Sequence, residues 1–203
     1  MIAIVDIGIG NLGSIVSMLE KCKVKALRTS SASDIERADK IILPGVGSFD
    51  NFMKKLDESR LIPILGKKAL DEKIPIIGIC LGMQILGKRS EEGMLSGLGW
   101  LDADTVKFKF KADDGLRIPH MGWNTVKIHG EPSIFKDMDE EPRFYFVHSY
   151  HLVCKDKKDV LATTHYGYDF ASSVRKGNIY GTQFHPEKSH KFGMRLLKNF
   201  SEL

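Results

Sequence analysis

The clearest candidate for chemistry in this sequence is a cysteine framed by glycines. Cys80 lies between Gly78 and Gly82 in "PIIGICLGMQILG", residues 75–87. The residues before it are apolar, as in a buried strand, and apolar positions after it recur at helical spacing. A nucleophile on such a strand-to-helix turn stands clear of the sheet, and a helix N-terminus favours its thiolate. We predict that Cys80 is a nucleophile and that the Leu81 amide binds an oxyanion; a buried structural cysteine is the alternative.

A thiolate nucleophile for acyl transfer needs a base that is held by a third group, and seven histidines could supply it. Only His185, in "FHPEKS", has a carboxylate at a suitable spacing. Pro186 restrains His185 to an extended conformation, in which residues two apart face the same side. Glu187 can therefore orient the His185 imidazole. Alone, this tripeptide would equally fit a surface turn, but with Cys80 it predicts a Cys-His-Glu triad.

A third segment, "LPGVGSF" at residues 43–49, follows a predicted strand and should end at the same sheet edge as Cys80. The glycines around Val46, Gly45 and Gly47, expose backbone amides and permit a peptide flip. We predict that these three residues contribute to an oxyanion hole. A simple Pro-Gly turn is the alternative.

The N-terminal "GIGNLG", Gly8 to Gly13, matches a dinucleotide-binding pattern and lies between a predicted strand and a predicted helix. A Rossmann site also needs an acidic residue about 20 positions later to hold the ribose. Here Arg28 is followed by three hydroxyl residues, and Asp34 is the first carboxylate. An NADP site using Arg28 stays open, but a tight strand-to-helix turn is the favoured interpretation.

The elements that must position these residues alternate in type through the first half of the chain. Strands are predicted at 2–6, 24–28, 40–45 and 75–79, and helices at 11–22 and at 50–71 with a break near residues 62–63. After Gly97 the segments become short and β-rich, and an amphipathic helix at 189–203 closes the chain. This pattern predicts an α/β fold: an open, mostly parallel sheet flanked by helices, with an added antiparallel β-rich portion in the second half.

Composition limits the class of protein. The 203 residues fit one domain, 1–203, and the net charge of +4 is scattered without a basic stripe, which argues against a nucleic-acid partner. The three cysteines include no CxxC pair, so we predict neither a disulfide framework nor a metal site and expect a cytoplasmic protein. No apolar run approaches the length of a membrane span, so no membrane association is expected.

The motifs "PGVGSF", "GICLGMQ" and "FHPEKS", in this order, resemble those of class I (triad) glutamine amidotransferases, which have a flavodoxin-like fold. The resemblance continues through "RSEEG", "PHMGWN" and "FVHSYH", and so covers almost the whole chain. Within the family, the sequence is most similar to the glutaminase subunits of imidazole glycerol phosphate synthases.

This resemblance implies a substrate, a reaction and a partner. Cys80 would attack the side-chain amide of glutamine to give a γ-glutamyl thioester and ammonia, without a cofactor. Four residues match glutamine-holding positions: Gln84, His148, Ser149 and Tyr150. Three others match the surface that faces a (β/α)₈ cyclase or synthase subunit in a heterodimer: Asn11, Trp123 and Lys188. That partner would receive the ammonia and use it in histidine biosynthesis.

Several segments depart from the histidine-pathway pattern, among them "DIGIGNLGS", "LGKRSEEG" and "HYGYDF". They resemble paralogues that supply ammonia for the amidation of a sugar carboxylate in surface-glycan biosynthesis, so the acceptor has two candidates. A stand-alone γ-glutamyl hydrolase is a more remote alternative.

Overall fold

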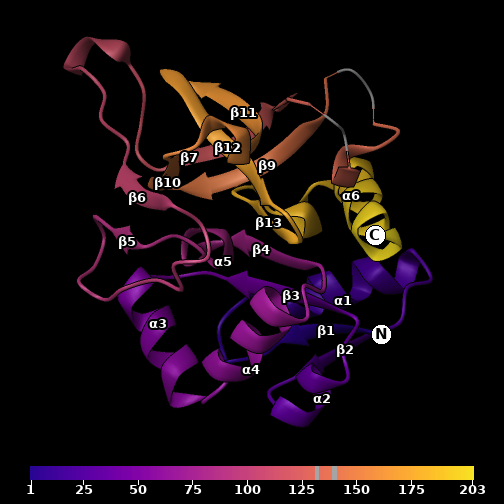
Figure 1. The fold of residues 1–203 in the computed structure, drawn as a ribbon. Helices are drawn as coiled ribbons and strands as arrows, with labels where there is room; N and C mark the ends of the chain where they lie inside the picture. The colour runs from indigo at the N-terminus through magenta and orange to yellow at the C-terminus, as the bar shows by residue number, and fades with distance from the viewer. Residues whose placement is uncertain (131–132, 139–140) are drawn as a thin grey trace.

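The computed structural model describes residues 1–130, 133–138 and 141–203. Eleven of the described strands form one sheet, in the order β2-β1-β3-β4-β13-β12-β10-β6-β5, with β11 paired to β12 and β8 paired to β11. Strands β7 (His120–Thr125) and β9 (Arg143–His148) form a separate antiparallel pair. Figure 1 shows the parallel strands in the lower part of the molecule and the antiparallel portion above them.

The parallel part of the sheet is built from the first half of the chain and one late strand. It contains β2 (Ala26–Thr29), β1 (Ile2–Val5), β3 (Lys40–Gly45), β4 (Ile76–Cys80) and β13 (Ile179–Thr182). Adjacent strands in this order are all parallel. The order is that of a flavodoxin-like doubly wound sheet, in which ligands bind beyond the carboxyl ends of the strands.

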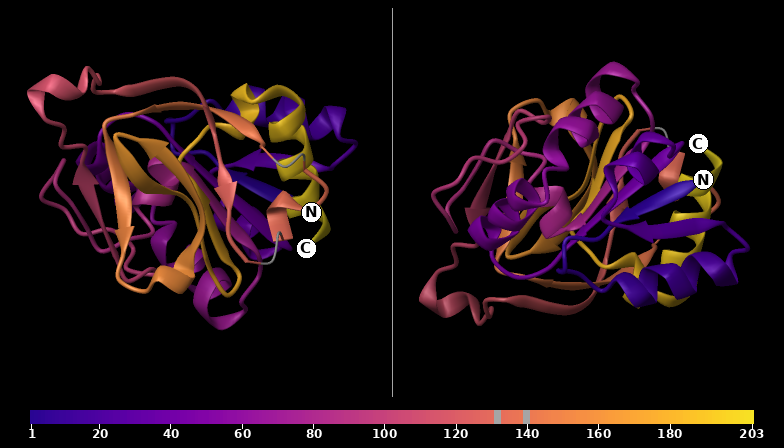
Figure 2. Two further views of the ribbon diagram at one scale, coloured as in Figure 1. Left: turned by 90° about the horizontal axis from the view of Figure 1, so that it is seen from above. Right: turned by 90° about the horizontal axis from the view of Figure 1, so that it is seen from below.

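Helices cover both faces of this part because its strands are apolar on both sides. Alternate residues of β1 point to opposite faces, so that Ala3 and Val5 join one apolar cluster and Ile2 and Ile4 join the other. The first cluster is covered by α2 (Ala32–Glu36), α3 (Phe49–Glu58) and α4 (Ile62–Gly66). The second is covered by α1 (Leu12–Lys21) and α6 (His190–Glu202), as the view from below in Figure 2 shows.

The antiparallel strands extend the same sheet. These strands are β12 (Tyr168–Lys176), β10 (Tyr150–Cys154), β6 (Ala103–Lys107), β11 (Val160–Tyr166) and β8 (Lys127–Ile128). A two-residue strand, β5 (Arg89–Ser90), pairs in parallel with β6 at the edge. The predicted β-rich portion is therefore present. Strand β5 was not predicted, because two residues are too few to show a strand pattern in the sequence.

The structure corrects two local predictions. The helix after Cys80, α5, covers only Leu81–Gln84, and the apolar residues that follow it form turns instead of a longer helix. The helical region expected at 50–71 is broken between Glu58 and Ile62, close to the predicted break, and ends in a π-helical turn at Lys67–Asp71. A one-turn helix has a smaller dipole than the predicted one, so α5 gives the thiolate less support than expected.

Candidate active site

Cys80 lies at the end of β4 in a conformation that L-residues rarely adopt, with φ 55° and ψ −110°. The turn is tight because α5 passes directly over the ends of β3 and β4. A Cβ on Gly82 would overlap the carbonyl oxygen of Leu43, and one on Gly78 would overlap the carbonyl oxygen of Gly82. The framing glycines are therefore required by close backbone approach. The strain at Cys80 is the feature expected of a nucleophile held on a turn.

His185 and Glu187 lie where β13 leads toward α6. The Nδ1 atom of His185 is 2.8 Å from Oε1 of Glu187, and both side chains are almost fully buried. The backbone of His185 is fixed at both ends: its N–H donates to the Tyr145 carbonyl at 2.9 Å, and its carbonyl accepts from the Ser189 hydroxyl at 2.6 Å. The structure thus forms the pair predicted from the H-P-E spacing.

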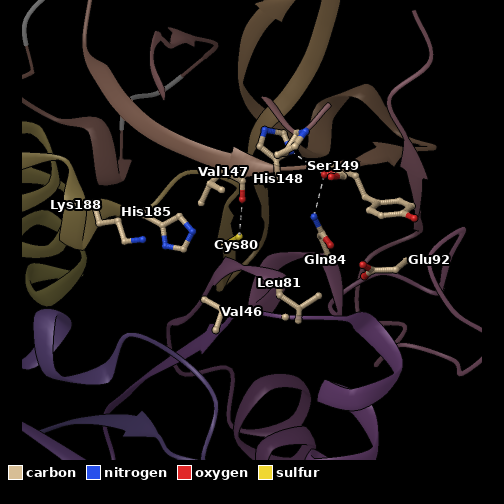
Figure 3. A pocket seen from close by; sticks show the side chains of 13 residues that line it. Val46, Cys80, Leu81, Gln84, Glu92, Val147, His148, Ser149, His185 and Lys188 are labelled. Carbon is tan, nitrogen blue, oxygen red and sulfur yellow. Dashed lines mark hydrogen bonds between the residues drawn. The ribbon is translucent and has the colours of Figure 1, made fainter. Parts of the chain in front are cut away.

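A cavity of about 440 Å³ brings Cys80 and His185 together with other predicted residues. Figure 3 shows the His185 ring beside Cys80 at this cavity. The Nε2 atom of His185 is buried and has no hydrogen-bond partner within the described part of the chain. Burial lowers the pKa of His185, but Cys80 and Glu187 outweigh it and raise this pKa to about 10. The arrangement favours an imidazolium next to a sulfur that can lose its proton.

The predicted oxyanion segment lies directly beside Cys80. Gly45, at the end of β3, is in register with Cys80, and a Cβ there would approach the Gly82 nitrogen to 2.7 Å. Val46 and Gly47 line the cavity together with Leu81, and Gly47 has a φ of +93° that favours glycine. The four residues predicted to bind an oxyanion are therefore grouped around the sulfur.

The predicted glutamine-holding residues also line the cavity. Gln84, His148, Ser149 and Tyr150 all belong to its lining, and Figure 3 shows Gln84 and Ser149 across Cys80 from His185. Glu92, which was not among the predicted site residues, lines it as well, and its Oε2 accepts from the Phe49 N–H at 2.9 Å. The signal for Glu92 was the "RSEEG" segment, where it is one of two adjacent glutamates, and spacing alone could not tell them apart.

A chain of hydrogen bonds fixes the protons of two buried histidines behind the cavity. His148 Nδ1 is 2.8 Å from the Tyr150 carbonyl, which can only accept, so neutral His148 carries its proton there and its Nε2 accepts. His120 Nδ1, 3.0 Å from that Nε2, must then donate, and His120 Nε2 accepts from the Asn124 amide at 3.2 Å. Each group in this series of hydrogen bonds has its partner while both imidazole rings are neutral. Protonation of either ring would break one of these hydrogen bonds.

The stability of the protein should therefore decrease on acidification. Burial lowers the pKa of His120 to about 4, and it also lowers those of His148 and His151. Below about pH 6.5, the usual histidine pKa, these histidines bind protons in the unfolded chain but stay neutral in the folded chain. The two protons excluded from His120 and His148 would reduce the free energy of unfolding by a slope approaching about 2.5 kcal/mol per pH unit near pH 5, and His151 adds to it in the same direction.

Urea unfolding midpoints between about pH 7 and about pH 5 would measure this slope. His185 does not contribute in this range. Its raised pKa gives stability that is complete below about pH 6.5 and is lost as the pH rises through about 10. The variant His120→Gln should be less stable at neutral pH but show a shallower slope. A free energy of unfolding that does not change over this pH range would contradict the hydrogen bonding of His120 and His148 as neutral rings.

The residues predicted to face a partner lie on one side of the cavity. Lys188 lines both the cavity and a neighbouring hollow that also contains Asn11, Glu187 and His190. Trp123 is 40% exposed and stacks on His190, with ring centroids 5.4 Å apart and planes at 3°. Asn11, Trp123 and Lys188, far apart in sequence, are therefore linked through shared neighbours at one surface.

The glycine turn that resembles a dinucleotide site has a different local use. Asp6 Oδ1 accepts from the Gly8 N–H at 2.8 Å, and Asp6 Oδ2 accepts from Arg28 at 2.7 Å. The guanidinium that an NADP site would need is thus paired with Asp6. All three cysteines are free thiols, and the described residues contain no cluster of side chains suited to a metal ion. None of the described helices is long and apolar enough to cross a membrane.

Comparison with known proteins gives a consistent assignment. The family model for class-I glutamine amidotransferases matches residues 3–202. The chain is 54% identical over 200 residues to imidazole glycerol phosphate synthase subunit HisH 2 of Methanococcus maripaludis, with 98% of each chain covered. It is 49% identical over 203 residues to the subunit of the same name from Pseudomonas aeruginosa, with 100% of each chain covered.

Solved structures support the fold. A glutamine amidotransferase structure superposes with a TM-score of 0.74 at 20% identity, covering 99% of this chain and 97% of the other. PurLQS from Thermotoga maritima gives a TM-score of 0.72 at 18% identity, covering 98% and 96%. At such identities the likeness concerns the fold alone, whereas the family model and the closely similar relatives extend over the whole sequence. The chain therefore belongs to the class-I glutamine amidotransferase family.

Proposed function

We propose that this protein is the glutaminase subunit of an imidazole glycerol phosphate synthase. It would hydrolyse glutamine to glutamate and ammonia and deliver the ammonia to a (β/α)₈ synthase subunit in histidine biosynthesis. The observation that carries the proposal is the buried grouping of Cys80, His185 and Glu187 at one cavity, in a chain about half identical to named HisH subunits.

The geometry assigns each member of the triad a step. Oε1 of Glu187 accepts the hydrogen bond, so His185 carries a proton on Nδ1 and turns Nε2 toward the sulfur. Nε2 takes the thiol proton to give the imidazolium that its pKa of about 10 favours, and the Cys80 thiolate then attacks the side-chain carbonyl carbon of glutamine. The same proton then passes to the leaving nitrogen, and ammonia departs from a γ-glutamyl thioester. Water, deprotonated by His185, hydrolyses the thioester to glutamate and restores the thiol.

Charge on the carbonyl oxygen during attack would be stabilised by backbone amides at the end of β3 and at Leu81. Val46, Gly47 and Leu81 line the cavity next to Cys80, which is where such donors are needed. We propose that the peptide at Gly47 reorients during the catalytic cycle, since glycine can exchange its positive φ for a negative one without a steric cost.

The polar wall opposite His185 would hold the α-amino and α-carboxylate groups of glutamine. Glu92 contributes a carboxylate suited to the α-ammonium, and Gln84 contributes an amide beside Ser149. Replacing Glu92 with Gln keeps an oxygen for the Phe49 N–H but removes the charge. We expect KM for glutamine to rise about tenfold or more while kcat changes little, because a charge-assisted hydrogen bond is lost in ground and transition state alike.

Steady-state kinetics with varied glutamine would measure this effect. Glu91→Gln is a matched control, because Glu91 binds the Lys107 N–H and Lys109 away from the cavity. A reduced kcat with unchanged KM in Glu92→Gln would contradict the assignment.

The partner would cover the cavity on the side of Asn11, Trp123 and Lys188. Ammonia released into water at neutral pH becomes ammonium and is no longer a nucleophile, so the reaction needs an enclosed exit. Met121 and Trp123, on β7, are 62% and 40% exposed, and Val46 is exposed at the cavity edge. Apolar side chains exposed around a catalytic opening are suited to burial against another subunit.

The test is product formation with the cognate barrel subunit and the histidine-pathway acceptor, N′-phosphoribulosyl formimino aminoimidazole carboxamide ribonucleotide. Glutamine should support cyclisation and yield glutamate stoichiometrically, and ammonia should support it without this subunit. If ammonia works but glutamine does not, although glutamine analogues still modify Cys80, the acceptor is another compound. A sugar carboxylate amidated in surface-glycan biosynthesis is then the alternative, as the sequence departures suggest.

A further inference from the structure

We propose that Gln183 is a further catalytic residue of this site: its side-chain N–H donates to the sulfur of Cys80 and stabilises the thiolate. The inference rests on the proposed function, because it concerns the same nucleophile. The Nε2 atom of Gln183 is 3.7 Å from the Cys80 Sγ, within the range of an N–H···S hydrogen bond, and the Gln183 side chain is fully buried.

The strand order places Gln183 beside the nucleophile. Strand β13 is the parallel neighbour of β4, and its last residue, Thr182, is in register with Ile79. Gln183, one residue later, is therefore level with Cys80. Its backbone N–H donates to the Ser172 carbonyl at 2.9 Å, which fixes the chain at this point. Gly45 on β3 and Gln183 thus flank the nucleophile from its two neighbouring strands.

The amide orientation follows from its neighbours. The Tyr150 carbonyl can only accept, so Gln84 must present Nε2 to it, at 3.0 Å. The same Nε2 is 3.0 Å from Oε1 of Gln183 and donates to it. Because the oxygen of the Gln183 amide is used in this way, its nitrogen must face the sulfur. The donor is held in place before any substrate binds, which is the condition for electrostatic stabilisation without reorganisation.

The sulfur needs such a donor because, apart from His185, its surroundings give a thiolate little support. The thiol can donate to the Val147 carbonyl, 4.0 Å away, and this oxygen would repel a thiolate once the proton has moved to His185. Helix α5 has only four residues and gives limited help from its N-terminus. Gln183 keeps its own protons throughout. It offsets the Val147 carbonyl by placing a partial positive charge against the sulfur when the negative charge forms.

Alkylation of Cys80 by iodoacetamide tests the proposal without glutamine or a partner. Rates would be measured across pH on the full chain, with peptide mapping to separate Cys80 from Cys22 and Cys154. Gln183→Leu removes the donor at similar volume, so we expect the apparent pKa of the reaction to rise and the rate at neutral pH to fall about tenfold. In the glutaminase assay, kcat should fall about as much while KM for glutamine changes little.

Ser173→Ala is the matched control. Ser173 is fully buried on the adjacent β12, and its hydroxyl donates to the Gly181 carbonyl at 2.8 Å, away from the sulfur. It should lower the urea unfolding midpoint to a similar extent without changing the alkylation profile. If Gln183→Leu does not fold, Gln183→Glu keeps the shape and the bond from Gln84, and its carboxylate should also raise the apparent pKa of alkylation.

Two results would overturn the proposal. One is an unchanged alkylation profile in whichever of these Gln183 variants folds. The other is an equal change in Ser173→Ala, which would show a general effect of packing. Failure of the proposed function has a different signature: glutamine hydrolysis would persist in a chain without Cys80, whatever the alkylation profile shows.

Discussion

Replacing Cys80 with alanine is expected to abolish glutamine-dependent synthesis while ammonia-dependent synthesis by the partner continues at its normal rate. The sulfur forms and breaks every covalent bond to the substrate in the proposed mechanism, and no other described residue of the cavity has a thiol. Loss of a covalent nucleophile typically reduces kcat by about 10⁴-fold or more. Glutamate release, measured with the partner and acceptor present, would report the loss.

Cys154→Ala is the control for this experiment. Cys154 is a partly buried thiol at the end of β10, and burial raises its pKa to about 12, so it does not form a reactive thiolate. It should retain glutaminase activity. Both variants should also bind the partner equally, because neither cysteine is on the surface proposed for docking. Comparable glutaminase activity in Cys80→Ala and the unmodified chain would exclude the nucleophile assignment.

Replacing Gly82 with alanine should be the most destabilising single-methyl change at the site. Its Cβ would overlap the Leu43 carbonyl oxygen, which belongs to the central strand β3 and cannot move without disrupting the pairing with β4. We expect the free energy of unfolding to fall by about 3 kcal/mol or more, because backbone and not a flexible side chain must shift. Urea unfolding monitored by tryptophan fluorescence would measure the change.

Gly66→Ala makes the same chemical change at an unconstrained position. Gly66 has helical angles, φ −61° and ψ −48°, and an added Cβ would meet no atom within 4 Å. The variant should be as stable as the unmodified chain or more stable by up to about 1 kcal/mol. If Gly82→Ala were equally harmless, the close approach of α5 to β3 would not explain the glycine in the motif.

The three candidate triad residues were predictable from the sequence because each has a local signature. Cys80 is framed by glycines that permit a tight turn, and Glu187 follows His185 by the two residues that place side chains on one face. The contact between Cys80 and His185 could not be derived from periodicity, since it depends on β13 entering the sheet next to β4. The two segments were joined in advance by the chemical need of a thiolate nucleophile for an oriented base, and then by the resemblance to a known family.

Other parts of the site had no local signature. Gln183 and His120 act through partners about 100 and 28 positions away, and such pairs appear only when the strands are assembled. The one-turn length of α5 was also hidden, because Ile85 and Leu86 are spaced as in a helix but are buried in turns. Apolar spacing reports burial, and burial does not by itself distinguish a helix from a packed turn.

The proposed covalent chemistry can be tested most directly with a glutamine analogue that carries a diazoketone or chloroketone. The protein would be incubated with the analogue, with and without excess glutamine, and the modified residue would be found by peptide mapping. The mechanism predicts stoichiometric labelling of Cys80, protection by glutamine, and loss of glutaminase activity in parallel. Labelling of a different residue, or full glutaminase activity after Cys80 is labelled, would contradict it.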